Sequence, residues 1–230
     1  MAFLEKLTKQ YPLTKTTSSL YLEIAKTRFE MGELFSENKE YQFEYAKSLK
    51  LCDEILEKVS ESPVKDECEQ LKKKILEVLL NCQIDTYIPI QQFSKIRIDY
   101  KNIKEVTFSI LKLNGQSQRE FAKKIKEEDK QYLIKKLSEL KEWIVKLPDA
   151  KDHQKYSTEI VLPKLNQGFY LLVGKIKGNK PYLKDFQVTN LTLLTQPKGK
   201  YQVLDRNHGK PIVNAKVSLK KNEIIVMINI

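Results

Sequence analysis

The stretch from Lys95 to Ile110, KIRIDYKNIKEVTFSI, determines the fold class that the sequence predicts. Every second residue is apolar from Ile96 to Tyr100 and again from Val106 to Ile110. Successive side chains of a β-strand point to opposite faces, so this spacing indicates two strands that are buried on one face. The intervening residues of the first strand are charged and are expected to face solvent: Lys95, Arg97 and Asp99.

Upstream of this stretch the apolar residues recur at three- and four-residue steps, which is typical of amphipathic helices. The spacing predicts helices over residues 18–35, about 40–59 and about 63–81, after a polar leader that contains Pro12. Ser62-Pro63 supports the start of the third helix, because serine caps helices and proline suits the first helical position. Antiparallel hairpins of this kind resemble tetratricopeptide-type repeats, and a plain helical bundle explains the same pattern.

Downstream, Asn114-Gly115 marks a turn, and apolar residues at helical spacing among lysines and glutamates predict a helical insertion at about 117–141. Further strands are expected at four places: Trp143–Leu147, Tyr156–Leu162, Phe169–Val173 and Phe186–Val188. Turn-forming residues separate these runs, and the pattern favours an antiparallel β-sandwich over residues 84–190.

Strand patterns recur in the tail of the chain, residues 191–230, at Tyr201–Arg206 and Ala215–Leu219, around a turn at 207–212. About forty residues are too few to close a sandwich. The tail is expected either to pair with the preceding sheet or to supply the opening strands of a further, incomplete β domain. The sequence thus predicts a multidomain α+β protein with a helical region at 1–83, the β-sandwich with its insertion, and this tail.

The formal net charge is +11, from 41 Lys and Arg residues and 30 Asp and Glu residues. Clustered lysines attract phosphate backbones, but acidic residues interrupt them here, as in Lys126–Lys130. A solvated surface is therefore expected, and nucleic acid is not an expected partner. Binding of a polyanion would require five lysines to gather on one face: Lys123, Lys124, Lys126, Lys135 and Lys136.

Cysteine and histidine residues do not form a recognisable site in the sequence. Cys52, Cys68 and Cys82 have no C-x-x-C spacing and no histidine close to them. The first two are interpreted as small buried apolar residues in helices, and one thiol must stay unpaired within the chain. His153 and His208 are expected in exposed loops, because no nucleophile pattern accompanies them.

The remaining candidate residues do not indicate a catalytic or binding site either. Trp143 lies at an alternating position and is expected in the core. The glycines of the second half do not match a phosphate-binding loop: Gly174, Gly178 and Gly209. No enzyme activity, cofactor or metal is therefore predicted. No run of about 18 uncharged apolar residues occurs, so neither a membrane span nor a secretion signal is expected.

Several local patterns resemble one family when they are taken in order. They are Tyr87-Ile88-Pro89 leading into Ile98–Asn102, the strand Val106–Leu113, Trp143–Asp149, Ser157–Pro163 with Gly168–Leu172, and the turn Asp205–Ile212 with Ala215. Together they resemble the amino-terminal part of large alpha-2-macroglobulin-like proteins of Bacteroidetes-type bacteria, over roughly residues 40–220. The resemblance implies a helical region, one macroglobulin-like sandwich and the opening strands of another β domain.

Members of that family are large extracytoplasmic proteins thought to trap peptidases through a bait region and, in many, a reactive thioester. The thioester pattern is Cys-Gly-Glu-Gln, and no cysteine of this chain precedes a glycine. The resemblance therefore implies a non-catalytic scaffold region without bait region or thioester, in an extracytoplasmic or periplasmic protein. The chain would then be a fragment, a truncated gene product or a separately expressed region.

Its implied partners are other domains of the parent protein and, through the full-length protein, peptidases. The helices alone suggest an alternative, because stacked helix pairs often bind a peptide or a partner protein in a groove. On that interpretation the chain is an independent interaction module that uses its helical hairpins.

Overall fold

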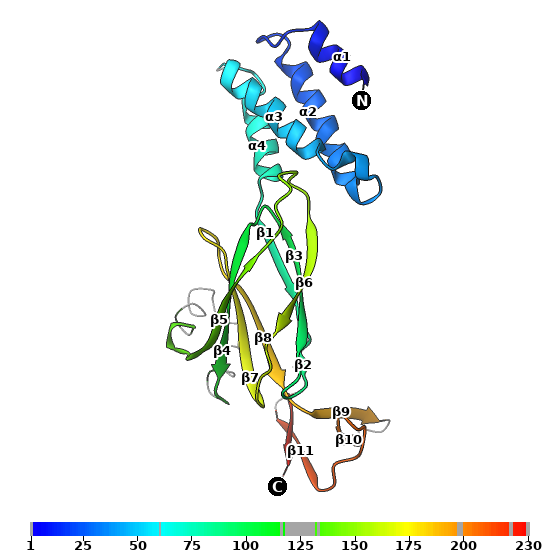
Figure 1. Ribbon diagram of the computed structural model, residues 1–230, viewed down its shortest axis with the longest axis vertical. Coiled ribbons are helices and arrows are strands. Elements are labelled where there is room, and N and C mark those ends of the chain that lie inside the picture. The colour runs from blue at the N-terminus through cyan, green and yellow to red at the C-terminus, as the bar shows by residue number, and fades with distance from the viewer. Residues whose placement is uncertain are drawn as a thin grey trace. The chain divides into compact units, whose positions relative to one another are not determined.

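The computed structural model describes residues 2–59, 61–115, 117, 132, 134–196, 200–220 and 223–228. The fold is α+β, as predicted, with helices first and strands afterwards (Figure 1). The chain divides into two compact units. Unit 1 comprises residues 1–81, 98–106 and 144–158, and unit 2 comprises residues 82–97, 107–143 and 159–230.

Four α-helices belong to unit 1: α1 (Ala2–Gln10), α2 (Ser18–Glu33), α3 (Glu44–Lys58) and α4 (Lys65–Ile75). Short 3-10 turns at Leu34–Ser36 and Lys39–Tyr41 connect α2 to α3. The three predicted helices correspond to α2, α3 and α4. The segment that was expected to be a polar leader without a helix contains α1, so that prediction is wrong. The Tyr21 hydroxyl connects this segment to α2, because it donates to the carbonyls of Thr8 and Tyr11 at 3.1 and 3.0 Å.

The third helix ends at Ile75 rather than near Asn81, and the following residues form strand β1 (Leu79–Gln83). The cause is a side chain from elsewhere in unit 1. The Asn102 amide donates to the carbonyls of Ile75 and Glu77, both at 2.8 Å. It thereby satisfies carbonyls that a longer helix would have bonded internally.

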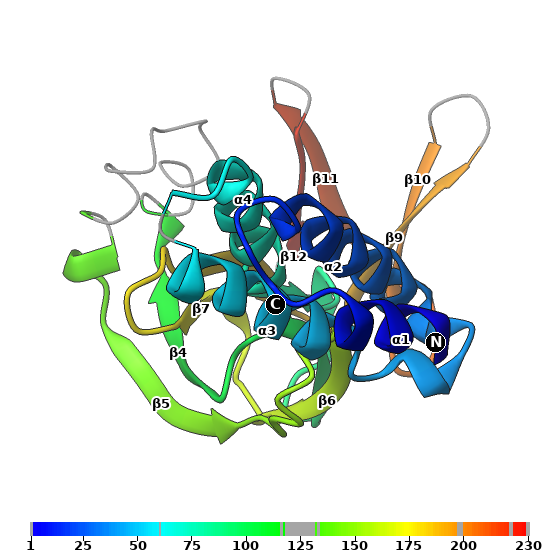
Figure 2. The ribbon, with the colours of Figure 1, turned by 90° about the horizontal axis from the view of Figure 1, so that it is seen from above.

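Helices α2, α3 and α4 pack side by side around a shared core (Figures 1 and 2). Its buried apolar side chains include Leu22, Ala25, Cys52, Ile55, Cys68 and Leu71. Cys52 and Cys68 are fully buried, which confirms their interpretation as apolar core residues. At Gly32 a Cβ atom would lie 2.7 Å from the Tyr45 ring, so only glycine allows this ring to pack against α2.

A buried ion pair crosses the interface between α2 and α3. Arg28 Nη1 lies 2.7 Å from Glu44 Oε2, and the two side chains are 8% and 0% exposed. Lys47 also lies 2.7 Å from Glu44, from a position that is half exposed. Because the Glu44 side chain is fully buried, these two cationic partners replace the hydration that it loses on folding.

We expect Arg28→Met to destabilise the protein by about 3 kcal/mol, because it leaves a buried carboxylate with one partner. Lys47→Met is the matched control, and it should cost less than about 1 kcal/mol because Lys47 is partly solvated. Urea denaturation gives both values. Equal costs for the two variants would contradict the stated role of Arg28.

Eight strands form two sheets: β1, β2 (Tyr87–Ile88), β3 (Ser94–Lys101), β4 (Glu105–Leu113), β5 (Glu139–Lys146), β6 (Tyr156–Leu162), β7 (Gly168–Lys175) and β8 (Tyr182–Val188). The orders are β1-β3-β6 and β2-β8-β7-β4-β5. The strands predicted from alternation are present. The larger sheet is mixed rather than antiparallel as predicted, because the edge segment β2 runs parallel to β8. The Gln187 and Thr189 amides donate to the carbonyls of Thr86 and Ile88, both at 2.8 Å.

Asp99 was expected to face solvent, and that prediction is wrong. Its side chain is 6% exposed and accepts a hydrogen bond from the Ser157 hydroxyl. Both neighbours in β3, Ile98 and Tyr100, are buried as well. This end of β3 is therefore covered on both faces, which alternation in one strand cannot reveal.

The predicted insertion begins with a reciprocal cap. Asn114 and Ser117 exchange backbone-to-side-chain hydrogen bonds of 2.8 Å, the arrangement that starts a helix. Most of the insertion, residues 118–131 and 133, lies outside the described residues. Ile134 and Leu137 pack against a small apolar cluster of unit 2: Leu111, Leu113, Leu171 and Val173.

The tail forms two hairpins, β9 (Leu191–Gln196) with β10 (Lys200–Asp205), and β11 (Ala215–Lys220) with β12 (Glu223–Ile228). Strands β10 and β11 were predicted, whereas β9 and β12 were missed. Each hairpin makes its own two-stranded sheet and does not extend the five-stranded one.

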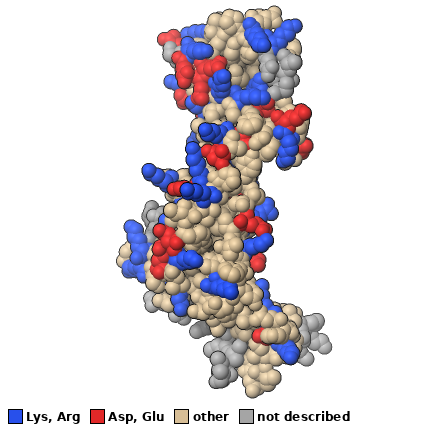
Figure 3. All heavy atoms as spheres, viewed as in Figure 1, with Lys and Arg blue, Asp and Glu red and all other residues tan. Residues whose placement is uncertain are grey.

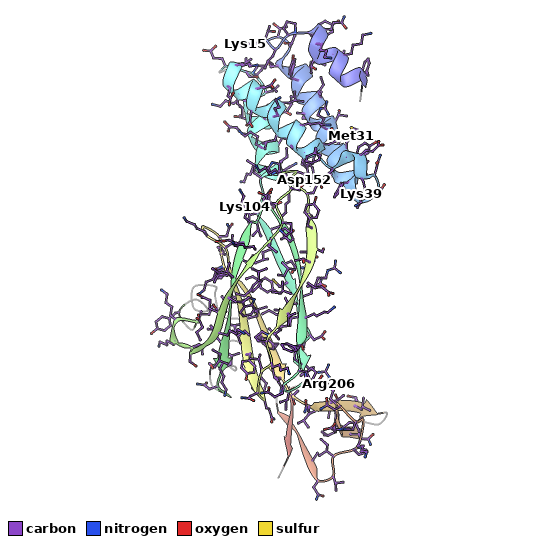
Figure 4. All side chains as sticks on the ribbon, in the orientation of Figure 1. Lys15, Met31, Lys39, Lys104, Asp152 and Arg206 are labelled. Carbon is purple, nitrogen blue, oxygen red and sulfur yellow. The ribbon has the colours of Figure 1, made fainter. Side chains whose placement is uncertain are left out.

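The first hairpin is bonded to the end of the larger sheet within unit 2. The Arg206 amide donates to the Asn190 carbonyl at 2.7 Å, and its guanidinium donates to the Tyr87 carbonyl at 2.5 Å (Figure 4). The Ile90 amide donates to Asn190 Oδ1 at 2.9 Å. Each of these bonds has a backbone group as donor or acceptor, and together they fix the start of the tail.

Candidate functional site

A set of buried and half-buried polar contacts in unit 1 lies where the loop before β6 meets the helices. We call it the junction network, and it consists of Gln42, Asn102, Asp152, Gln154 and Tyr156. Figure 4 labels Asp152 at the end of the helices that lies next to the strands of unit 1. Asp152 and Gln154 are 2% and 6% exposed, which is unusual for their residue types.

Gln154 links this loop to the backbone around the α2–α3 connection. Its Nε2 donates to the carbonyl of Gly32 at 3.1 Å and to the carbonyl of Gln42 at 3.3 Å. Gly32 lies in the last turn of α2, and its carbonyl also accepts from the backbone amide of Leu34 at the C-cap. A loop side chain therefore completes the hydrogen bonding of a helix end more than a hundred residues earlier in the chain.

Asp152 is the acceptor at the centre of the network. Its Oδ1 accepts from the backbone amide of Gln154 at 3.0 Å, and its Oδ2 accepts from Gln42 Nε2 at 2.9 Å. The Tyr156 hydroxyl donates a short hydrogen bond to the same Oδ2. Burial, and then the bond to Asp152, raise the pKa of Tyr156 to about 12, so this phenol keeps its proton at neutral pH.

Asn102 and His153 form the other arm of the junction. Both residues have positive φ angles, 56° and 60°, a conformation that asparagine and histidine adopt more readily than most residues. His153 Nδ1 lies 2.8 Å from Asn102 Oδ1. Because the Asn102 NH₂ group already donates twice, its oxygen must accept here, and Nδ1 of His153 carries the hydrogen.

His153 was expected in an exposed loop, and that prediction is wrong, because its side chain is half-buried. Burial lowers the pKa of His153, an effect that the nearby Asp152 opposes and Lys101 reinforces. The neutral imidazole is therefore favoured in the folded protein. His208 does lie in an exposed turn, as predicted, beside Asp205 at 2.8 Å.

Aromatic rings enclose the network. Tyr156 lies 6.3 Å from the Phe35 ring and 6.1 Å from the Tyr100 ring, between ring centroids. Lys101 lies 4.9 Å above the centre of the Tyr45 ring, and burial lowers its pKa. Because Asp152 is almost completely removed from water, the hydrogen bonds around it act in a medium of reduced polarity.

The arrangement is suited to holding chain segments together. Across the part of the chain that the structure describes, every buried side-chain nitrogen and oxygen has a hydrogen-bond partner. Within the same described ranges, no three His, Cys, Asp or Glu side chains gather as a metal ion would require. Trp143, expected in the core, is half-buried and stacks on Phe108 at 5.7 Å in unit 2.

Sequence reasoning missed every member of the junction network. Gln42, Asp152 and Gln154 lie in polar segments that look like ordinary loops. Their only distinguishing property is burial, which depends on segments far apart in the sequence. Pro148-Asp149 correctly marked a turn in this region, but a turn signal does not reveal which side chains turn inward.

The surface charges are mixed in sign, as expected from the sequence. Figure 3 shows lysines and arginines beside acidic side chains on the visible face. Lys26 pairs with Glu23 at 2.9 Å and with Glu67 at 2.8 Å, and Lys95 pairs with Glu159 at 2.6 Å. None of the described helices has the length and apolar character that a membrane crossing needs.

No protein-family model matches the sequence, and comparison with curated proteins finds no match. The chain is similar to a solved fragment of Escherichia coli alpha-2-macroglobulin spanning domains MG0-NIE-MG1, with 12% identity and a TM-score of 0.46, over 65% of this chain and 54% of that one. A fragment of the same protein spanning NIE-MG1 is 13% identical with a TM-score of 0.46, and the match covers 67% of this chain and 88% of that one. A CARDB domain from Pyrococcus furiosus is 10% identical with a TM-score of 0.29, and the match covers 49% of this chain and 92% of that one. The chain thus spans about half the length of the first fragment.

We expect Gln154→Ala to lower the free energy of unfolding by about 2 kcal/mol, because two carbonyls lose their buried donor. Gln154→Glu should cost more, since it places a carboxylate against those carbonyls. The exposed neighbour variant Lys155→Ala is the control and should change stability by less than about 0.5 kcal/mol. Chemical denaturation followed by circular dichroism measures all three. A Gln154→Ala protein as stable as the control would contradict the role of the network.

Stability should fall as the pH is lowered from about 7.5 to about 5, because the unfolded chain binds a proton at His153 more readily than the folded protein does. The group's folded pKa lies below its unfolded value, so its contribution is present above the unfolded pKa and is lost on acidification. His153→Asn tolerates the positive φ and should flatten this dependence. Equal slopes for wild type and His153→Asn in urea titrations would refute this.

Proposed function

We propose that this chain is a non-catalytic scaffold region of an alpha-2-macroglobulin-like, peptidase-trapping protein, and that it carries neither bait region nor thioester. In this proposal the two sheets form a macroglobulin-like sandwich, the helices are repeat-like hairpins, and the tail hairpins open a further β domain. Its partners are other domains of the parent protein, in an extracytoplasmic or periplasmic setting. The order and spacing of the sequence patterns from Tyr87 to Ala215 support this family.

The observation that carries the scaffold role is the junction network. Buried side chains connect the α2–α3 region with the loop before β6, and each buried polar atom among them is paired. A hinge or a moving lid requires few buried contacts and exposed backbone hydrogen bonds. The junction has the opposite character, which suits an element that holds neighbouring parts in a fixed geometry.

The proposal is tested by mixing the purified chain with an equimolar amount of a broad-specificity serine peptidase. We expect hydrolysis of a large protein substrate to continue at the rate measured without the chain, because trapping machinery is not part of this region. An equal amount of an unrelated protein controls for substrate competition. Stoichiometric inhibition by the chain itself would contradict the scaffold role.

The family assignment is tested separately, in the gene. We expect the reading frame to continue beyond Ile230 into further β domains, with a Cys-Gly-Glu-Gln pattern or a bait-like segment among them. A natural stop codon directly after Ile230 would sink the proposal that the chain serves as part of a larger trap.

A further inference from the structure

Two of the three cysteines meet inside the helical core. Cys52 lies on α3 and Cys68 lies on α4, both side chains are 0% exposed, and the two helices pack directly against each other. Both side chains belong to the same buried apolar cluster, and each thiol contributes to the pKa shift of the other. Cys82, by contrast, lies on β1 and is 4% exposed. The pair formed by Cys52 and Cys68 is therefore specific to the α3–α4 interface.

A plain packing role explains one buried cysteine more easily than two in the same helix interface. A thiol is only a weak hydrogen-bond donor, so two buried sulfhydryl groups add little to stability beyond their packing. Alanine or valine would fill the same space without a reactive group. What the pair adds is the capacity to form a covalent bond across the helix interface.

We propose that Cys52 and Cys68 are a disulfide-forming pair that joins α3 to α4 when the protein folds under oxidising conditions. The reaction forms one Sγ–Sγ bond and releases two protons and two electrons. A disulfide oxidant such as oxidised glutathione accepts them and becomes two glutathione thiols. This site goes beyond the scaffold role and does not depend on the family assignment.

The environment of the pair determines when the bond can form. Burial raises the pKa of Cys52 to about 12 and also raises the pKa of Cys68. Thiolates rather than thiols attack disulfides, and the oxidant cannot reach either sulfur in the folded core. Oxidation should therefore occur during folding, while the thiols are accessible, and the folded reduced protein should react slowly.

The same burial protects the bond once it exists. A reductant must reach a sulfur atom that has no exposed surface. The closed loop runs from residue 52 to residue 68 and includes the connection between the two helices. Closing a loop of about this length restricts the unfolded chain and should raise the melting temperature by about 5–10 °C.

The experiment refolds the full chain from urea in a glutathione buffer and, in parallel, in dithiothreitol. After trapping of free thiols with iodoacetamide, intact mass and peptide mapping identify the cysteines that are linked. We expect a single link between the peptides that carry Cys52 and Cys68, one alkylated thiol at Cys82, and the higher melting temperature in the oxidised protein. When folded, reduced protein is placed in the same glutathione buffer, Cys52 and Cys68 should remain free thiols. They should then react with iodoacetamide only after the protein is unfolded.

Variants separate this pair from general thiol oxidation. Cys82→Ala should behave as wild type, whereas Cys68→Ala should show no internal link and no oxidation-dependent rise in melting temperature. If Cys68→Ala folds poorly, the peptide map of the oxidised wild-type protein still shows which cysteines are linked. A link through Cys82, mixed glutathione adducts without the internal bond, or an oxidised form that melts at or below the temperature of the reduced form would each overturn the proposal.

Discussion

The constraint on which unit 1 depends is the pairing of polar groups that it buries. Asp152 and Gln154 are almost completely removed from water, and an unpaired amide or carboxylate in such a place costs several kcal/mol or more. Their partners come from the end of α2 and from the α2–α3 connection. The loop can adopt only the geometry that meets these partners. Left-handed backbone at Lys151 and His153 is the local strain that this geometry imposes.

Polar pairing also defines how the helices meet one another. Apolar side chains from α2, α3 and α4 supply the area that drives their packing, but area has no preferred direction. The pair Arg28–Glu44 and the bond from the Ser48 hydroxyl to the Ala25 carbonyl, at 2.7 Å, do have direction. A shift of α3 along α2 would break both and leave buried groups unpaired. Register along this interface is therefore set by polar groups within an apolar surface.

The periodicity of apolar residues predicted those helices and strands that local sequence determines. The spacing of two around Ile98 and Phe108, and the helical spacing through Cys52 and Cys68, identified strands and helices at nearly correct bounds. Two of the errors share a cause, since each depends on a distant segment. Asp99 is buried because another part of unit 1 covers it, and α4 stops early because Asn102 binds its last carbonyls. The junction network is the extreme case. Asp152 bonds its near neighbours Gln154 and Tyr156, but the bonds that reach Gln42, Gly32 and Ile75 join segments far apart in the chain.

The hydrogen bonds of the junction network also indicate which residues fold together with the helices. The helices alone would expose the carbonyls of Gly32 and Ile75, both of which are bonded by side chains that lie beyond residue 100. Unit 1 accordingly includes residues 98–106 and 144–158 with the helices. Its cooperative unit is therefore discontinuous in sequence, and the helices become ordered together with strand ends that are made later in the chain. Such non-local closure costs loop entropy before the buried hydrogen bonds form, so the junction is expected to form late in folding.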